Sequence, residues 1–252
     1  MNIDLALILT LLTVVSGVVV AMDKLVWKTA ERDSRVAPDV ISTLVEYSRS
    51  FFPVLIFVLV IRSFVFEPFR IPSGSMKPTL TDGDFIFVKK FSYGLRLPVV
   101  ERKIIETGQP ERGDVVVFRL PSNTSVNYIK RVIGLPGDEV AYERQRLTIN
   151  GVVMDLQANG EIFDNVPVYV ENLEGRIHKT LIHDPGHSKQ DGVYIIPEGQ
   201  YFVMGDNRDR SKDSRYIGTI DDKYLVGEAV RIWMHFIPGE MPDWGRIGMK
   251  IE

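Results

Sequence analysis

The strongest constraint in this sequence is an uncharged apolar run near its start. Leu5 to Met22 reads LALILTLLTVVSGVVVAM and holds no charged side chain. With Ile3 added, the run is long enough for a helix to cross about 30 Å of hydrocarbon. A cleavable secretion signal needs a basic segment before its apolar core, whereas Met1 to Asp4 is acidic. We therefore expect residues 1–22 to form an uncleaved transmembrane helix; a buried helix of a soluble protein is the alternative.

A second apolar run is shorter. Phe51 to Ile61 reads FFPVLIFVLVI and is followed by Arg62, whose long side chain can reach toward water. Pro53 falls in the first turn of a helix that begins here, where proline is tolerated. We expect residues 49–66 to form a second transmembrane helix, with a re-entrant or interfacial helix as the alternative. The polar, mixed-charge residues 23–48 are then the loop between the two spans.

Lysine and arginine are distributed unevenly around these two runs. None precedes the first run, and those between the runs are Lys24, Lys28, Arg32, Arg35 and Arg49. Positive charge in a short loop marks the cytoplasmic side of a membrane. We therefore expect a multi-pass protein of the inner (plasma) membrane, in contact with its lipids, with the remainder of the chain on the outer, periplasmic side.

From Glu67 onward the chain consists of short β-rich segments separated by turn signals such as Leu135-Pro136-Gly137-Asp138. The expected strands are Phe85–Val88, Val115–Phe118, Val126–Ile133, Glu139–Tyr142, Leu147–Ile149, Val193–Ile196, Tyr201–Met204 and Ala229–Trp233. The predicted fold class is mainly β: an antiparallel coiled-sheet or barrel-like outer domain over residues 67–252, preceded by the two helices. Residues 155–197 are more polar and less periodic, so we expect an insertion or peripheral subdomain there.

The composition excludes several kinds of chemistry. The chain has no cysteine, which excludes disulfides, iron–sulfur clusters, thiolate catalysis and cysteine zinc sites. A net charge of −3 gives no indication of a nucleic-acid partner. His178, His183 and His187 lie in a polar stretch whose spacing matches no strong metal motif, and we interpret them as solvated loop residues. We therefore expect no metal and no other cofactor, and the histidines give little support to a Ser-His-Asp site.

One short stretch is a candidate for chemistry. Ile71 to Leu80 reads IPSGSMKPTL. Gly74 permits backbone angles that other residues resist, and Pro72 and Pro78 restrict the residues before them. We expect a stiff, non-helical loop that presents Ser75. A serine held in this way can act as a nucleophile when a base lies nearby, although an ordinary turn has the same composition.

The candidate base is a lysine. Tyr128 to Ile133 reads YIKRVI, and strand alternation places Tyr128, Lys130 and Val132 on one face. A lysine must be neutral to accept a proton from serine, and its ordinary pKa is about 10.4. Apolar surroundings or a neighbouring cation such as Arg131 lower that value. Lys130 therefore fits the role, with a solvated surface lysine as the alternative.

A third stretch, Gly205 to Arg215, reads GDNRDRSKDSR and follows a predicted strand. Its acids, bases and hydroxyls suit a hydrogen-bonded network, or else an ordinary polar loop. The three stretches, in this order after apolar spans, resemble the bacterial type I signal peptidases (leader peptidases), which use a serine–lysine dyad. The resemblance covers most of the chain and is faintest over residues 155–197. Relatives with a cysteine pair in the outer domain differ from this chain there.

The resemblance implies a membrane-bound serine endopeptidase that removes signal peptides from exported preproteins after A-x-A-like sites. It assigns Ser75 as nucleophile, Lys130 as general base, and the Ser75 N–H with the Ser73 hydroxyl as the oxyanion hole. It also implies that Ser211 orients the lysine and that Asp213 and Arg215 support the site. The residues similar to the family's substrate-pocket walls are Phe69, Ile71, Val117, Tyr128 and Ile129.

Two other functions are compatible with parts of the sequence. A self-cleaving repressor of the serine–lysine type has the same catalytic residue types, but it is cytoplasmic and carries a DNA-binding portion. A membrane-tethered β domain that binds peptides or scaffolds a complex without cutting them is the alternative from another class. Loss of function on replacing Ser75 or Lys130 separates an enzyme from such a binding domain.

Overall fold

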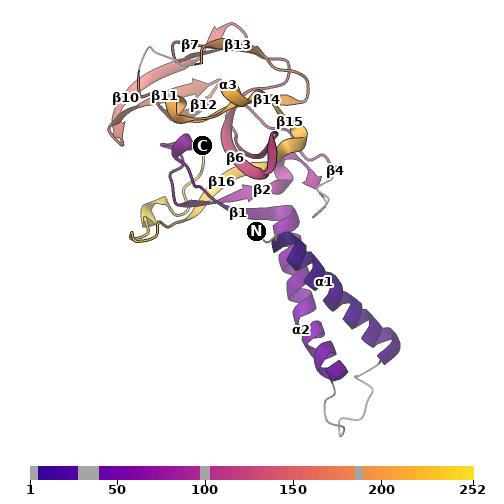
Figure 1. The fold of residues 1–252 in the computed structure, drawn as a ribbon. Helices are drawn as coiled ribbons and strands as arrows, with labels where there is room; N and C mark the ends of the chain where they lie inside the picture. The colour runs from indigo at the N-terminus through magenta and orange to yellow at the C-terminus, as the bar shows by residue number, and fades with distance from the viewer. Residues whose placement is uncertain (1–4, 28–39, 97–102, 185–189) are drawn as a thin grey trace. The chain divides into compact units, whose positions relative to one another are not determined.

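The chain forms two compact units in the computed structural model (Figure 1). The residues that the structure describes are 5–27, 40–96, 103–184 and 190–252. Unit 1 comprises Met1–Phe66 and Leu95–Ile105, and unit 2 comprises Glu67–Gly94 and Glu106–Glu252.

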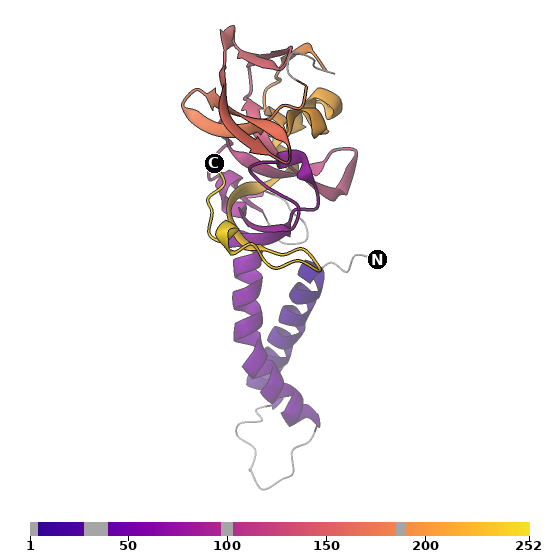
Figure 2. The same cartoon turned by 90° about the vertical axis from the view of Figure 1, so that its left-hand side faces the viewer.

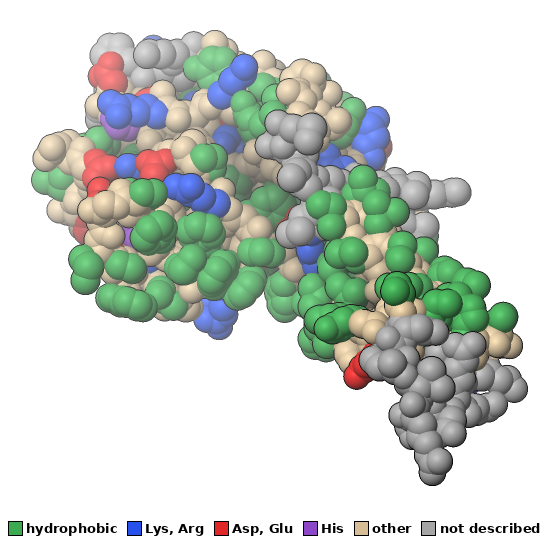
Figure 3. All heavy atoms as spheres, turned by 60° about the horizontal axis from the view of Figure 1, so that its bottom comes forward, with side chains coloured by type: hydrophobic (Ala, Val, Ile, Leu, Met, Phe, Trp, Pro, Cys, Tyr) green, Lys and Arg blue, Asp and Glu red, His purple; other side chains and the backbone are tan. Residues whose placement is uncertain are grey.

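Unit 1 is built on two packed helices. Helix α1 (Leu5–Met22) continues into a π-helical turn, and α2 (Val40–Val60) does the same. Many of their apolar side chains point outward, including Leu11 at 56% exposure and Phe57 at 66% (Figure 3). The segments Leu7–Trp27 and Val40–Val60 are each long and apolar enough to cross a membrane. Outward-facing leucine and phenylalanine suit lipid better than water.

The second helix differs from the prediction at both ends. It begins at Val40, so part of the predicted loop of residues 23–48 is helical, and residues 61–65 are π-helical. The prediction began the helix where the charged residues end, but backbone hydrogen bonding continues through polar residues as well. Arg49, directly after this extension, forms an ion pair with the buried Asp23. Residues 28–39 of the predicted loop lie outside the described residues.

Unit 2 is organised around a seven-stranded sheet in the order β1-β2-β16-β5-β6-β14-β15. Its strands are β1 (Phe66–Arg70), β2 (Asp84–Lys89), β5 (Val115–Leu120), β6 (Asn123–Gly134), β14 (Gln200–Met204), β15 (Ile220–Asp221) and β16 (Leu225–His235). The pairings from β2 through β16, β5 and β6 to β14 are antiparallel. Residues 115–118 of β5 are all buried, which shows that both faces of the sheet centre are covered.

Smaller sheets complete the fold. The four-stranded sheet contains β13 (Gly192–Ile195), β7 (Glu139–Glu143), β8 (Arg146–Ile149) and β9 (Val152–Val153). The three-stranded sheet contains β10 (Asp155–Phe163), β11 (Val166–Leu173) and β12 (Arg176–Leu181). Unit 1 also holds a ribbon of β3 (Leu95–Arg96) and β4 (Lys103–Ile105). The predicted mainly β class with two apolar N-terminal helices is confirmed.

Residues 155–197 are more closely integrated than the prediction of a peripheral subdomain suggested. Strand β13 pairs with β7 in the four-stranded sheet, and Leu181 N donates to Asp206 O at 2.8 Å. The β10–β11 hairpin lies beside the loop after β1, where Lys77 Nζ is 2.8 Å from Asp164 Oδ2 (Figure 2). The periodicity was weak because most residues of β10 are exposed on both faces of the strand.

Candidate active site

The loop after β1 presents Ser75 on a short helical turn. Residues Gly74–Met76 form one 3-10 turn, closed by Lys77 N donating to Gly74 O at 3.2 Å. The prediction of a non-helical loop is therefore wrong: three of the five residues between Pro72 and Pro78 form a helical turn. Met76 and Leu80 are fully buried and anchor the turn in the core. Ser75 is left half-buried at the surface.

Gly74 has a different role from the expected one. It is not among the glycines with left-handed backbone angles. A side-chain carbon at this position would lie 3.1 Å from Lys77 Cε, so the glycine makes room for the lysine stem. The backbone angles at this position do not call for glycine, whereas a larger residue would press on the lysine stem.

Lys130 of β6 reaches the Ser75 hydroxyl. Lys130 Nζ lies 2.7 Å from Ser75 Oγ and 2.7 Å from Ile129 O. It also lies 5.5 Å from the centre of the Tyr128 ring, on the strand face that alternation predicts. The lysine is only 3% exposed. The solvated-lysine alternative is therefore wrong.

Burial changes the protonation of this lysine. Removal from water disfavours the ammonium form and lowers the pKa of Lys130 to about 8, against the opposing influence of the Asp213 and Asp206 carboxylates. At that pKa about a tenth of the molecules carry a neutral amine at pH 7. The site therefore holds a usable base next to a hydroxyl.

The loop after β14 contains a buried ion pair. Arg215 Nε and Nη2 each lie 2.8 Å from the Asp213 carboxylate, and Asp213 Oδ2 accepts from Gly205 N at 3.0 Å. Arg215 Nη2 also donates to Arg208 O at 2.6 Å. A side-chain carbon on Gly205 would collide with Ser211 Oγ and lie 2.5 Å from Ser75 O. Only glycine fits at position 205, because the backbone there passes so close to the backbone oxygen of Ser75.

Ser73 and Ser211 have weaker contacts than the resemblance implies. Ser73 Oγ lies 3.5 Å from Ser75 Oγ, at the limit of a hydrogen bond. Ser211 Oγ is buried and has no hydrogen-bond partner among the described residues. No hydrogen bond therefore joins it to Lys130 in this structure.

The predicted pocket-wall residues divide between two clusters. Ile71, Val117 and Ile129 belong to one buried cluster, with Phe69 packed against it. Tyr128 instead packs in the neighbouring cluster, with its ring 6.1 Å from that of Phe118. Adjacent residues of a strand point to opposite faces, which separates Tyr128 from Ile129.

The interpretation of the histidines as solvated is wrong for His178. This residue is 4% exposed in β12, where Nε2 lies 3.3 Å from Glu171 Oε2, and burial lowers its pKa. Arg208 pairs with the same glutamate. His183 is half-buried, and His187 lies outside the described residues. The sequence carried no signal for this burial, because the apolar Ile177 beside His178 is the exposed residue of the two.

The sequence reasoning also missed an ion pair beside the catalytic candidates. Arg131 Nε and Nη2 lie 2.8 and 2.7 Å from the two oxygens of Asp206, and both residues are buried. The sequence pattern indicates Arg131 only as a neighbouring cation of Lys130. Its position directly after Lys130, with an acid at the start of the third stretch, was the signal for the pairing.

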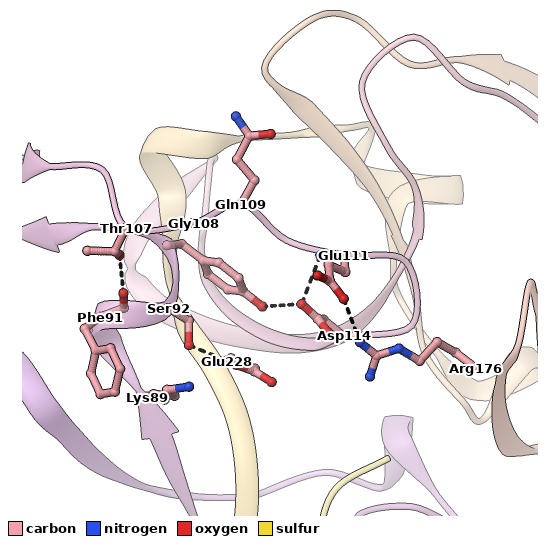
Figure 4. Close-up of a pocket in the computed structure, with 11 residues that line it drawn as sticks. Lys89, Phe91, Ser92, Thr107, Gly108, Gln109, Glu111, Asp114, Arg176 and Glu228 are labelled. Carbon is pink, nitrogen blue, oxygen red and sulfur yellow. Dashed lines mark hydrogen bonds and ion pairs between the residues drawn. The ribbon is translucent and has the colours of Figure 1, made fainter.

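A cavity of about 340 Å³ opens elsewhere on unit 2 (Figure 4). Acidic and basic side chains line it, and Tyr93 donates to Asp114 Oδ2 at 3.0 Å while Arg176 pairs with Glu111 at 2.7 Å. None of its lining residues is a candidate site residue. Ser75 and Lys130 therefore do not line this cavity.

Comparison with known proteins decides the family. The family model described as "Signal peptidase, peptidase S26" matches residues 44–234. The chain belongs to this family. Signal peptidase I of Pseudomonas fluorescens is 44% identical, with 99% of both chains covered. Signal peptidase I of Pseudomonas aeruginosa is 48% identical, over 82% of this chain and 79% of the relative.

Among solved structures, a signal peptidase I from Enterococcus faecalis V583 is 31% identical with a TM-score of 0.33, over 49% of this chain and 98% of that one. Membership of the signal peptidase family confirms the predicted resemblance and enzyme class. The chain is a peptidase that acts on signal peptides.

Proposed function

We propose that the chain cleaves exported preproteins with Ser75 as nucleophile and neutral Lys130 as general base. The observation that carries the proposal is the 2.7 Å contact between Lys130 Nζ and Ser75 Oγ, made by a lysine that is 3% exposed. A base must lie within hydrogen-bond reach of the proton it takes, and its pKa must be close to the working pH. Lys130 meets both conditions with respect to the Ser75 hydroxyl, which supports the proposal.

The proposed reaction passes through an acyl-enzyme. Ser75 Oγ attacks the carbonyl carbon of the scissile bond while its proton passes to Lys130 Nζ. When the tetrahedral intermediate collapses, the ammonium returns that proton to the departing amine of the mature protein. Water then attacks the ester with Lys130 again as base, which frees the signal peptide and regenerates the serine.

The negative oxygen of each intermediate needs donors. We propose the Ser75 N–H and the Ser73 hydroxyl for this role, since Ser73 Oγ lies 3.5 Å from Ser75 Oγ. Preorganised donors of this kind stabilise the transition state by about 3–4 kcal/mol each. The Asp213–Arg215 pair, buried and joined to Gly205, would hold the surrounding loop in place.

We propose that the site prefers substrates with small side chains before the cleaved bond. The tightly packed cluster of Ile71, Val117 and Ile129, with Phe69 beside it, would leave only shallow apolar room near Ser75. Alanine-sized side chains fit such pockets, which agrees with A-x-A-like cleavage sites. Tyr128, in the neighbouring cluster, would contribute through the strand face it shares with Lys130.

Membrane anchoring completes the proposal. Helices α1 and α2 would span the inner membrane, with the basic residues 24–49 on the cytoplasmic side and unit 2 on the periplasmic side. Anchoring raises the local concentration of a substrate that is itself held in the bilayer. It adds no contact at the active site.

The decisive experiment uses the purified full chain in detergent with a preprotein. Ser75→Ala removes the nucleophile and leaves the turn intact, so we expect no detectable cleavage and an unchanged unfolding temperature. Cleavage by Ser75→Ala at the rate of the unaltered chain would refute the assignment. Ser125→Ala makes the same change at an exposed serine of β6 and serves as the matched control.

A further inference from the structure

Asn207 donates hydrogen bonds to two successive backbone carbonyls of the loop that carries Ser75. Its backbone N donates to Ser75 O at 3.1 Å, and its side-chain Nδ2 donates to Gly74 O at 2.9 Å. The residue is 4% exposed, so water does not compete for these bonds. Asn207 lies directly after Asp206 in the third stretch, where the sequence indicated only a polar network.

The bond to Gly74 O sets the direction of the Ser75 N–H. Both groups belong to one peptide unit, which is planar and trans, so the carbonyl and the N–H point in opposite directions. Fixing the carbonyl from one side therefore fixes the N–H on the other. Lys77 N donates to the same oxygen at 3.2 Å and adds a second restraint.

His183 holds the side chain of Asn207 in the required orientation. His183 Nε2 lies 2.9 Å from Asn207 Oδ1. Since Asn207 must turn its Nδ2 toward the Gly74 carbonyl, its Oδ1 faces the histidine, and His183 Nε2 must carry the hydrogen. An amide rotated by half a turn would lose both bonds.

The segment that carries His183 is itself anchored to the loop it supports. Leu181 N donates to Asp206 O at 2.8 Å, and His183 N donates to Asp209 Oδ2 at 2.7 Å. A continuous set of hydrogen bonds thus leads from the end of β12 through Asn207 to the peptide unit of Ser75. This segment lies within residues 155–197, where the sequence indicated only an insertion.

We propose that Asn207 and His183 are positioning residues that aim the Ser75 N–H at the oxyanion of the reaction intermediates. The inference rests on the proposed function, in which that N–H is an oxyanion donor. It assigns the segment after β12 a part in transition-state stabilisation. Neither residue touches the substrate, so they act on the rate of the chemical step and not on substrate binding.

The test compares kcat and KM for preprotein cleavage in full-length variants. Asn207→Asp keeps the oxygen that faces His183 but loses the donor to Gly74 O; we expect kcat to fall roughly tenfold to hundredfold, less than for loss of a whole donor. His183→Leu should lower kcat roughly tenfold, because a small misplacement of reacting groups slows chemistry. KM should stay within about twofold in both variants, since uniform binding is unaffected.

Two matched variants keep the test sharp. His183→Gln can donate from its amide in place of Nε2–H, so it should restore most of the kcat lost in His183→Leu. Asn172→Asp makes the same chemical change at a turn where only the oxygen is used, accepting from Gly175 N, and should leave kcat unchanged. The unfolding temperature of each variant reports separately on the fold.

The outcomes separate this inference from the proposed function. If Ser75→Ala is inactive while Asn207→Asp and His183→Leu cleave normally, the positioning role is overturned and the dyad stands. Equal losses in His183→Leu and His183→Gln, together with a lowered unfolding temperature, would assign the histidine to the fold alone and also overturn it. Activity in Ser75→Ala would remove both proposals.

Discussion

Lys130 Nζ and Ser75 Oγ lie 2.7 Å apart although 55 positions separate the two residues. The serine comes from a 3-10 turn after β1, and the lysine from the middle of β6. Strands β1 and β6 are not neighbours in the sheet. Their meeting therefore depends on the folded arrangement of the whole sheet and not on a local motif.

The rate of cleavage should follow the protonation of Lys130. Because burial lowers its pKa to about 8, the neutral base is scarce in acid and abundant above that pH. We expect kcat/KM to rise through pH 8 and then level off, measured with one preprotein across buffers of constant ionic strength. Lys130→Arg should be inactive throughout, since arginine stays charged. A rate already level below about pH 6 would contradict a lysine base.

Lys130 should also make stability depend on pH. Below pH 8 both folded and unfolded chains bind the proton, and burial of the charge destabilises the fold in full. Between pH 8 and the ordinary pKa of 10.5, the unfolded chain keeps the proton on Lys130 and the folded chain loses it. The free energy of unfolding therefore rises with pH over this range.

Lys130→Met removes this effect. The variant should be more stable than the unaltered chain by up to about 3 kcal/mol at pH 7, and this advantage should shrink toward pH 10. Denaturant unfolding at several pH values measures the difference. A constant difference over the range would show that Lys130 is not a buried titrating group.

Ser73 should contribute to the rate and not to binding. Ser73→Ala removes the hydroxyl that lies 3.5 Å from Ser75 Oγ. If that hydroxyl donates to the oxyanion, kcat should fall about 10²-fold to 10³-fold with KM nearly unchanged. Ser73→Thr keeps a hydroxyl and should retain far more activity. A rise in KM with normal kcat would instead assign Ser73 to substrate binding.

Replacing Arg215 should lower the free energy of unfolding. Arg215→Ala leaves the buried Asp213 carboxylate without its cation, which should destabilise the fold by about 3–5 kcal/mol. Lys223→Ala breaks the exposed pair with Asp221, and its effect should stay below about 1 kcal/mol. Urea unfolding of both variants provides the comparison, and equal effects would contradict a supporting role for the buried pair.

The sequence predicted the sheet segments best where the hydrophobic pattern was dense. The strand expected at Val115–Phe118 is the start of β5, and the one expected at Val126–Ile133 lies inside β6. Strand β10 was not predicted, because most of its residues are exposed and give no period. The start of α2 at Val40 was missed for a related reason, since polar residues can continue a helix that apolar residues define.

The sequence drew attention to residues whose chemistry is unusual, and the structure brings two of them, Ser75 and Lys130, within 2.7 Å of each other. It did not draw attention to residues that hold the loop through backbone contacts. A serine between prolines and a lysine among apolar strand residues attract notice in a sequence. Asn207 does not, because its importance comes from carbonyls of Gly74 and Ser75 that only the fold brings to it. His178 was misjudged for the same reason, as its partner Glu171 lies on the neighbouring strand.

The short connection from α2 to the reactive turn limits where chemistry can happen. Ser75 follows Val60 so closely that even a fully extended chain would carry it only about 50 Å from the end of the helix. If α2 lies in a bilayer, as proposed, the length of this connection sets the greatest distance at which the Ser75 hydroxyl can act from the end of the helix. On the proposed anchoring, we expect a polypeptide held in the same bilayer to reach the hydroxyl more often than a released protein with an identical scissile sequence.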